Sequence, residues 1–147
     1  MDTDALWKKR SPLHSVAGFG SRIKMARIIL IEDSNNLRGM LKKTLEYEGH
    51  EVLEAQDGKA GERFYQEGHA DLVITDIVMP NKDGIEIIIE LRRDFPGIKI
   101  LAISGGGRLK SECYLDMAKS LGAHDTLGKP FKQKDLLESV RKLLKQH

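Results

Sequence analysis

The sequence lacks the features of a secreted, membrane-embedded or metal-caged protein. It holds one cysteine, Cys113, which excludes an internal disulfide, and we expect this thiol to be buried or half-buried. No apolar run approaches the ~20 residues that a membrane-spanning helix needs, and the amino terminus lacks the basic-then-apolar order of a secretory signal. The five histidines are scattered, without the spacing of a zinc site. These absences predict a cytoplasmic protein that does not contact membranes.

The excess of basic residues is confined to the start of the chain. Residues 1–24 contain five basic and two acidic side chains, whereas the whole chain contains 24 and 22. The remainder therefore holds 19 basic and 20 acidic groups, a balance that gives no reason to expect nucleic-acid binding. Residues 1–24 also lack periodicity and contain Pro12, Gly18 and Gly20. We predict a disordered leader or tag over 1–25 and one folded domain over 26–147.

Strand-like and helix-like patterns alternate from residue 26 onward. Short apolar runs, several of them rich in β-branched residues, are each followed by apolar residues at helical spacing. The helix after Asp83-Gly84 is expected to place Ile85, Ile88, Ile89 and Arg92 on successive turns. Five strand–helix units in strict alternation predict an α/β domain with a parallel sheet and helices on both faces. The predicted strands span residues 28–31, 51–55, 72–76, 98–103 and 124–127.

Five polar residues that fit no apolar pattern fall at the ends of these strands. In a parallel sheet all carboxyl ends lie along one edge, which is where ligands bind in open α/β sheets. Three carboxylates there repel one another and favour a cation, and an all-oxygen ligand set suits Mg²⁺. A lysine and a hydroxyl suit phosphate oxygens, so this edge is predicted to hold a phosphoryl group beside a metal ion. The five residues are Glu32 and Asp33, Asp76, Ser104 and Lys129.

Taken together, these motifs resemble the receiver domain of two-component response regulators, of the stand-alone, chemotaxis-regulator-like type. The resemblance covers residues 26–147; each motif is weak alone, but the ordered set is specific. It implies a flavodoxin-like (βα)5 fold, a doubly wound parallel sheet with strand order 2-1-3-4-5. The matching motifs are Glu32-Asp33, Asp76-Ile77-Val78-Met79-Pro80, Asp83-Gly84, Ser104 and Lys129-Pro130-Phe131.

The resemblance also implies a role for the acidic residues. Asp76 would be the phosphoacceptor, receiving the phosphoryl group from a phosphohistidine of a histidine kinase or of a histidine phosphotransfer protein. Asp33 and Asp76 would bind Mg²⁺ or Mn²⁺ directly, and Glu32 would bind it through water. The backbone carbonyl of Val78 would be a further ligand.

For the residues on the other side of the pocket, the resemblance implies contacts with the phosphoryl oxygens. Ser104 and Lys129 would make these contacts, and the peptide bond between Lys129 and Pro130 would be cis. Movement of Ser104 would then alter the face formed by the fourth helix, the fifth strand and the fifth helix, which would dock to a downstream target protein. Thr126 departs from the family, which usually has an aromatic switch residue there, so we expect a smaller rearrangement than an aromatic flip.

Three interpretations of the whole chain compete. We favour a monomeric, stand-alone switch that is not a turnover enzyme, because the sequence ends just after the last predicted helix. A receiver fragment of a hybrid kinase or of a larger response regulator would look identical. A small Mg²⁺-dependent phosphatase with Asp76 as nucleophile is disfavoured, because Val78 stands where a second aspartate would be and a cap domain is missing. Val78 and Gly106 offer no side chain to orient water, which predicts a long-lived phosphoaspartate.

Overall fold

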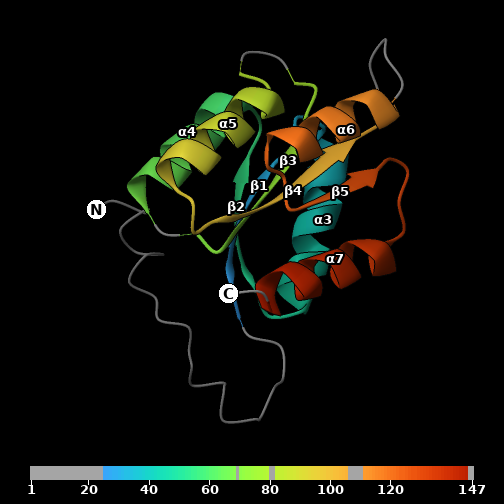
Figure 1. The fold of residues 1–147 in the computed structure, drawn as a ribbon. Coiled ribbons are helices and arrows are strands. Elements are labelled where there is room, and N and C mark those ends of the chain that lie inside the picture. Colours follow the sequence, from blue (N-terminus) through green and yellow to red (C-terminus); the bar gives the residue numbers. More distant parts are fainter. Residues whose placement is uncertain (1–24, 69, 80–81, 106–110, 146–147) are drawn as a thin grey trace.

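The computed structural model describes residues 25–68, 70–79, 82–105 and 111–145, which form five strands and five helices in alternation (Figure 1). The predictions for residues 1–24 and for Gly106 lie outside these ranges. Within the described residues, no helix is both long and apolar enough to cross a membrane. The strands are β1 (Arg27–Ile31), β2 (Glu51–Ala55), β3 (Leu72–Asp76), β4 (Lys99–Ser104) and β5 (Asp125–Gly128). The helices are α3 (Asn35–Tyr47), α4 (Gly58–Glu67), α5 (Gly84–Asp94), α6 (Ser111–Leu121) and α7 (Gln133–Lys145).

All neighbouring strands pair in parallel, in the order β2-β1-β3-β4-β5. The predicted doubly wound, flavodoxin-like fold is therefore confirmed. The strand order reverses between β1 and β3, so the loops that leave these two strands diverge to opposite faces of the sheet. A crevice at the carboxyl ends of such a strand pair is the usual ligand site of this architecture.

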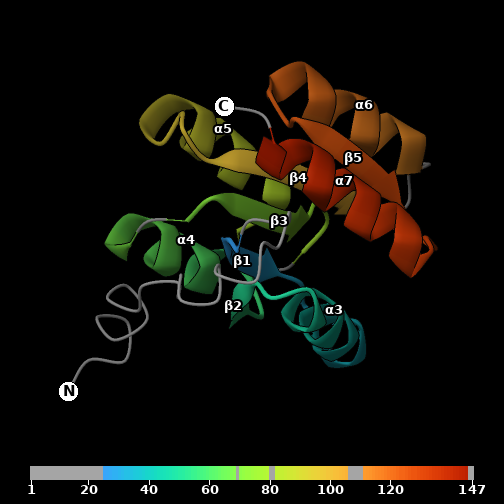
Figure 2. The same cartoon turned by 90° about the horizontal axis from the view of Figure 1, so that it is seen from below.

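Successive residues of the central strands point into two separate cores. On β1, Ile29 and Ile31 pack into one core, whereas Ile28 and Leu30 pack into the other. Residues of α4, α5 and α6 complete the first core, and residues of α3 and α7 complete the second. Figure 2 shows these two groups of helices on opposite sides of the sheet. Because the sheet is covered on both faces, its central strands read as continuous apolar runs.

The predicted strand boundaries are wrong by one residue at β4 and β5, and β1 begins one residue earlier than predicted, at Arg27. Ile98 was expected in the sheet, but its N–H donates to the carbonyl of Phe95 at 3.0 Å and closes the turn after α5. At the other end, Ser104 pairs with Gly128, so both strands extend one residue further toward the carboxyl edge. This extension brings Ser104 and the start of the Lys129 loop side by side.

The structure shows which side chains of α5 are buried, and it contradicts one side-chain prediction, that for Cys113. The buried side chains of α5 are Ile87, Ile88 and Leu91, whereas Ile89 is 44% exposed. The helix begins at Gly84, which packs so closely on β3 that a Cβ atom there would lie 2.3 Å from the carbonyl oxygen of Asp76. Cys113 is exposed on α6 rather than buried.

Candidate functional site

Three acidic residues meet at the carboxyl edge of the sheet. Glu32 and Asp33 follow β1, and Asp76 is the last residue of the neighbouring strand β3. One carboxylate oxygen from each residue lies within 4.8 Å of those from the other two. Glu32 and Asp76 are only 1% and 6% exposed, whereas Asp33 is exposed to solvent. This all-oxygen cluster of converging charges could bind a metal ion.

Lys129 supplies the positive charge that faces this cluster. Its Nζ lies 2.9 Å from Glu32 Oε1 and 2.9 Å from Asp76 Oδ2. Burial alone lowers the pKa of Lys129, but the hydrogen bonds to these two carboxylates outweigh burial and raise the pKa above its ordinary value. A Cβ atom on Gly105 would lie 2.1 Å from Lys129 Cβ. Because glycine has no Cβ atom, Lys129 can lie across the end of β4. The peptide bond from Lys129 to Pro130 is cis, as the sequence resemblance implied.

The backbone around Glu32 holds its carboxylate in place. Ser34 N–H donates to Glu32 Oε2 at 2.9 Å, and the Arg38 guanidinium donates to the Glu32 carbonyl at 2.7 Å. Burial raises the pKa of Glu32, and the Asp76 charge adds to this effect, whereas the Ser34 and Lys129 contacts oppose it. Sequence reasoning missed Arg38, because an arginine in the first turns of a helix is usually a solvated residue.

Ser104 is fully buried at the end of β4, and its hydroxyl has no hydrogen-bond partner among the described residues. Buried polar atoms are rarely left unpaired, so an orphan hydroxyl at this edge needs an explanation such as an absent ligand. The Ser104 carbonyl accepts a hydrogen bond from Lys129 N–H at 2.8 Å. The hydroxyl-bearing residue and the lysine are thus adjacent, as predicted from the ends of β4 and β5.

Described residues that follow β3 contact the end of this strand. Val78 N–H donates to Asp76 Oδ1 at 3.3 Å, and Gly84 N–H donates to the Ile77 carbonyl at 2.8 Å. Asp83 caps α5 by accepting a hydrogen bond from Glu86 N–H at 3.1 Å. Asp76 therefore has each carboxylate oxygen in contact with a different donor, Val78 N–H on one and the Lys129 ammonium on the other.

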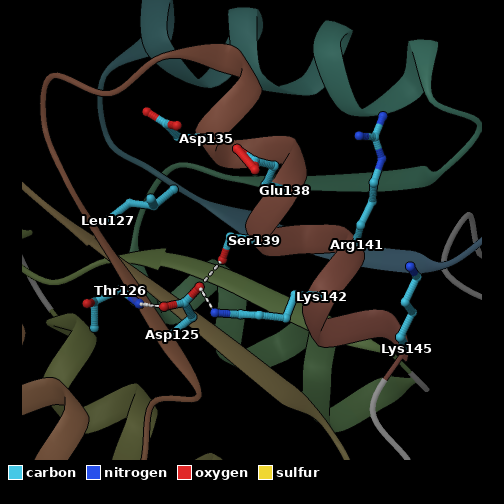
Figure 3. A pocket seen from close by; sticks show the side chains of 9 residues that line it. All are labelled: Asp125, Thr126, Leu127, Asp135, Glu138, Ser139, Arg141, Lys142 and Lys145. Atoms are coloured by element: carbon cyan, nitrogen blue, oxygen red, sulfur yellow. Dashed lines mark hydrogen bonds and ion pairs between the residues drawn. The ribbon is translucent and has the colours of Figure 1, made fainter.

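A separate hollow lies between β5 and α7, on the face that the sequence predicted to dock to a partner (Figure 3). At its floor, Asp125 Oδ2 accepts a hydrogen bond from the Ser139 hydroxyl and lies 3.1 Å from Lys142 Nζ. Asp135 and Glu138 lie toward one end of the hollow, and Arg141 and Lys145 lie toward the other. Thr126, at the family's usual aromatic position, also lines this hollow and is partly exposed.

Comparison with known proteins now gives the class of this chain. Residues 28–141 match the family model of the response regulator receiver domain, so the chain belongs to this family. Its members are the receivers of two-component systems, which interact with kinases and with downstream targets.

Two curated relatives show the range of proteins that carry such a domain. The response regulator receiver protein CpdR of Brucella abortus is 35% identical over 120 residues, which cover 82% of this chain and 98% of that protein. The transcriptional regulatory protein CpxR of Klebsiella pneumoniae is 34% identical over 122 residues, covering 83% of this chain and 50% of that protein. The chain thus spans about half the length of CpxR but almost all of CpdR.

Solved structures agree with the fold. A response regulator receiver domain from Clostridium thermocellum superposes with a TM-score of 0.76 at 29% sequence identity, covering 82% of this chain and 95% of that one. NtrX from Brucella abortus gives a TM-score of 0.76 at 27% identity, but there the match covers 28% of the longer chain.

Proposed function

We propose that this receiver is a phosphorylation-activated switch in which Asp76 accepts a phosphoryl group. The donor is a phosphohistidine on a histidine kinase or a histidine phosphotransfer protein. An Asp76 carboxylate oxygen forms the new O–P bond as the P–N bond breaks, and the imidazole leaves with the electron pair of that bond. Such a transfer depends on positioning and on neutralising charge more than on covalent help from the protein.

Glu32, Asp33 and Asp76 fit a hard divalent cation, and we propose Mg²⁺ with Mn²⁺ as a substitute. The fit is supported by the three convergent carboxylates, which make an all-oxygen ligand set. The Val78 carbonyl would join them. When bound, the ion neutralises charge on the phosphoryl oxygens.

Lys129 and Ser104 are proposed to hold the phosphoryl oxygens. The Lys129 ammonium already contacts Asp76, and the Ser104 hydroxyl is buried without a partner in the described structure. Engagement of that hydroxyl would draw β4 and the adjoining end of β5 toward Asp76. The face made by α6, β5 and α7 would then change and dock to a downstream target protein, while the domain itself remains a monomer that does not turn over substrate.

The observation that carries this proposal is the contact of one lysine with two buried carboxylates beside an orphan buried hydroxyl. A phosphatase is less well supported, because Val78, which has no carboxyl group, stands where that mechanism needs a second aspartate. The relatives include both a short receiver protein, CpdR, and a longer regulator, CpxR. Both the stand-alone and the fragment interpretation are therefore consistent with known relatives.

The proposal is tested by incubating the protein with acetyl phosphate and Mg²⁺ and following its intact mass. We expect a metal-dependent phosphoryl adduct that is absent from Asp76→Asn. Asp94→Asn is the matched control, because Asp94 is an exposed carboxylate at the far end of α5. A wild-type protein that stays unmodified, or an adduct that persists in Asp76→Asn, would overturn the assignment. Turnover of p-nitrophenyl phosphate would favour the phosphatase instead.

A further inference from the structure

We infer that Lys82 is a positioning residue for Asp76, acting through ion pairs that tie the segment after β3 to α4 and α5. This inference rests on the proposed function of Asp76 as phosphoacceptor. Lys82 lies between two of the sequence motifs, Asp76 to Pro80 and Asp83-Gly84, and belongs to neither. Its side chain is nevertheless only 9% exposed.

The Lys82 ammonium is shared by two glutamates from different helices. Nζ lies 3.0 Å from Glu62 Oε2 on α4 and makes a short ion pair with Glu90 Oε2 on α5. Glu90 Oε1 accepts a 2.6 Å hydrogen bond from the hydroxyl of Tyr65, a fully buried residue. Burial lowers the pKa of Lys82, but both glutamates counteract it and raise the pKa above its ordinary value, so the amine stays charged.

The backbone of Lys82 is fixed as tightly as its side chain. Gly58, the first residue of α4, lies so close that a Cβ atom there would be 2.0 Å from the Lys82 carbonyl oxygen. On the other side of the segment, Gly84 is pressed against the Asp76 carbonyl and hydrogen-bonded to Ile77. The described residues of this segment are therefore held between β3, α4 and α5.

The segment reaches the phosphoacceptor through Val78. Its N–H donates to Asp76 Oδ1 at 3.3 Å, which is at the long end of the hydrogen-bond range. A shift of a few tenths of an ångström would break this bond and leave Lys129 as the donor to the carboxylate among the described residues. Gly84 follows Lys82 by two residues, packs against the Asp76 carbonyl and donates a hydrogen bond to the Ile77 carbonyl, so loss of the Lys82 anchor would reach the Asp76 backbone through these described residues. Small misplacements of a reacting group are costly to transfer reactions.

Stability alone is a weak reason for a lysine at this position. Replacing a buried ion pair with apolar residues of similar volume is often neutral or stabilising, because the desolvation cost offsets the attraction. What the charged cluster adds is a defined position, since one ammonium must satisfy two carboxylates on separate helices.

The test is Lys82→Met, which keeps an unbranched side chain only one atom shorter and removes its charge. We expect the Mg²⁺ dissociation constant, measured by isothermal titration calorimetry, to rise about tenfold or more, as for other residues that orient metal ligands. The rate of phosphorylation by acetyl phosphate at subsaturating Mg²⁺ should fall by a similar factor. Lys82→Arg, which retains the charge, should recover most of both losses.

Lys42→Met is the matched control. Lys42 is also shared by two glutamates, with Nζ 3.8 Å from Glu46 and 3.3 Å from Glu54, but it links α3 to β2 on the other face of the sheet. We expect Mg²⁺ affinity and phosphorylation to stay at the wild-type level in this variant.

Lys82→Met leaves Glu62 and Glu90 without their cation, so the triple variant K82M/E62Q/E90Q is made in parallel, and the fold of each is checked by urea denaturation. A folded variant of either kind with wild-type Mg²⁺ affinity and wild-type phosphorylation would overturn the role of Lys82. A wild-type protein that binds Mg²⁺ but takes no phosphoryl group would instead overturn the proposed function, and the two failures are distinct.

Discussion

Lys129 acts as the counter-charge of the site before any ligand arrives. Glu32 and Asp76 are buried, and two carboxylates this close would destabilise the fold if neither were neutralised. The lysine meets both, which explains how an acidic pocket coexists with a stable domain. A divalent ion would take over much of this neutralisation, and the ammonium would then be available to a phosphoryl group. The same residue thus serves the fold and the proposed chemistry in turn.

His50 gives the fold a pH dependence that is separate from the site. Its imidazole is buried, and Nδ1 accepts a hydrogen bond from Ala26 N–H at 3.2 Å. Burial lowers its pKa below 6.5, although the Glu48 and Asp71 charges oppose this shift. Because the unfolded chain binds the proton more tightly than the folded one, the stability from neutral His50 is complete above about pH 6.5 and is lost as the pH falls toward the folded pKa.

We therefore predict that His50→Asn reduces the loss of stability on acidification. Asparagine keeps a hydrogen-bond acceptor for Ala26 N–H but does not titrate. Between about pH 7.5 and about pH 5.5, the free energy of unfolding from urea titrations should fall less in the variant than in the wild type. His124→Asn is the comparison, because His124 Nδ1 accepts a similar 3.0 Å bond from Ile100 N–H and its pKa is also lowered by burial. Parallel pH curves for wild type and His50→Asn would contradict the prediction.

At the level of whole elements, α7 is joined to β5 by a polar cluster. Asp125 accepts from the Ser139 hydroxyl, lies 3.1 Å from the Lys142 ammonium and accepts from Thr126 N–H at 2.9 Å. Burial raises the pKa of Asp125, but these three donors outweigh it and lower the pKa overall. Since β5 pairs with β4 through Ser104, movement of that residue can reach α7 through a single strand. This connection needs no aromatic side chain at position 126.

Removing one donor from this cluster should weaken the attachment of α7 without altering the carboxylate cluster around Asp76. We predict that Ser139→Ala lowers the free energy of unfolding by about 1 kcal/mol, because Asp125 loses a hydrogen bond in a buried setting. In a domain of this size the melting temperature should fall by roughly 2–4 °C, measured by calorimetry. Ser120→Ala is the control, since Ser120 is exposed on α6. Equal losses of stability in the two variants would contradict the role of Ser139 in attaching α7. Slower phosphorylation by acetyl phosphate in Ser139→Ala would show that this cluster also affects the reaction at Asp76.

The helix that follows the site shows where sequence reasoning stops. The sequence does not define the buried face of α5, because three consecutive isoleucines, 87–89, fit more than one helical phase. The contact of Gly84 with the Asp76 carbonyl, at the start of this helix, is tertiary and is not visible in that pattern. Lys82 escaped notice for a similar reason, because its two partners lie 20 residues before it on α4 and 8 residues after it on α5.

The whole molecule was more predictable than its details. Alternating strands and helices determine a parallel sheet, and a parallel sheet brings the ends of β1 and β3 together, so the carboxylate cluster followed from chain order alone. The exposure of Cys113 did not follow, because a single residue on a helix has no periodicity of its own. Backbone architecture follows from repeated patterns, whereas individual contacts depend on packing between distant segments.

Binding of Mg²⁺ should be visible as stability of the entire domain. A ligand that binds only the folded state stabilises it by about 2.7 kcal/mol at a hundredfold excess over its dissociation constant. Part of this gain is offset here, because Lys129 already neutralises Glu32 and Asp76 and must yield some of that contact. We predict that saturating Mg²⁺ raises the melting temperature by roughly 3–8 °C and that EDTA reverses the rise.

Asp33→Asn separates this effect from general salt stabilisation. Asp33 is the exposed member of the cluster, so its neutralisation should leave the metal-free melting temperature nearly unchanged while removing most of the rise with Mg²⁺. Asp94→Asn, at an exposed carboxylate on α5, should keep the full rise. If Asp33→Asn responded to Mg²⁺ like the wild type, the ion would not be held by the cluster at the ends of β1 and β3. If the rise in melting temperature with Mg²⁺ is lost in Asp33→Asn but kept in Asp94→Asn, the stabilisation of the whole domain comes from metal binding at the carboxylate cluster.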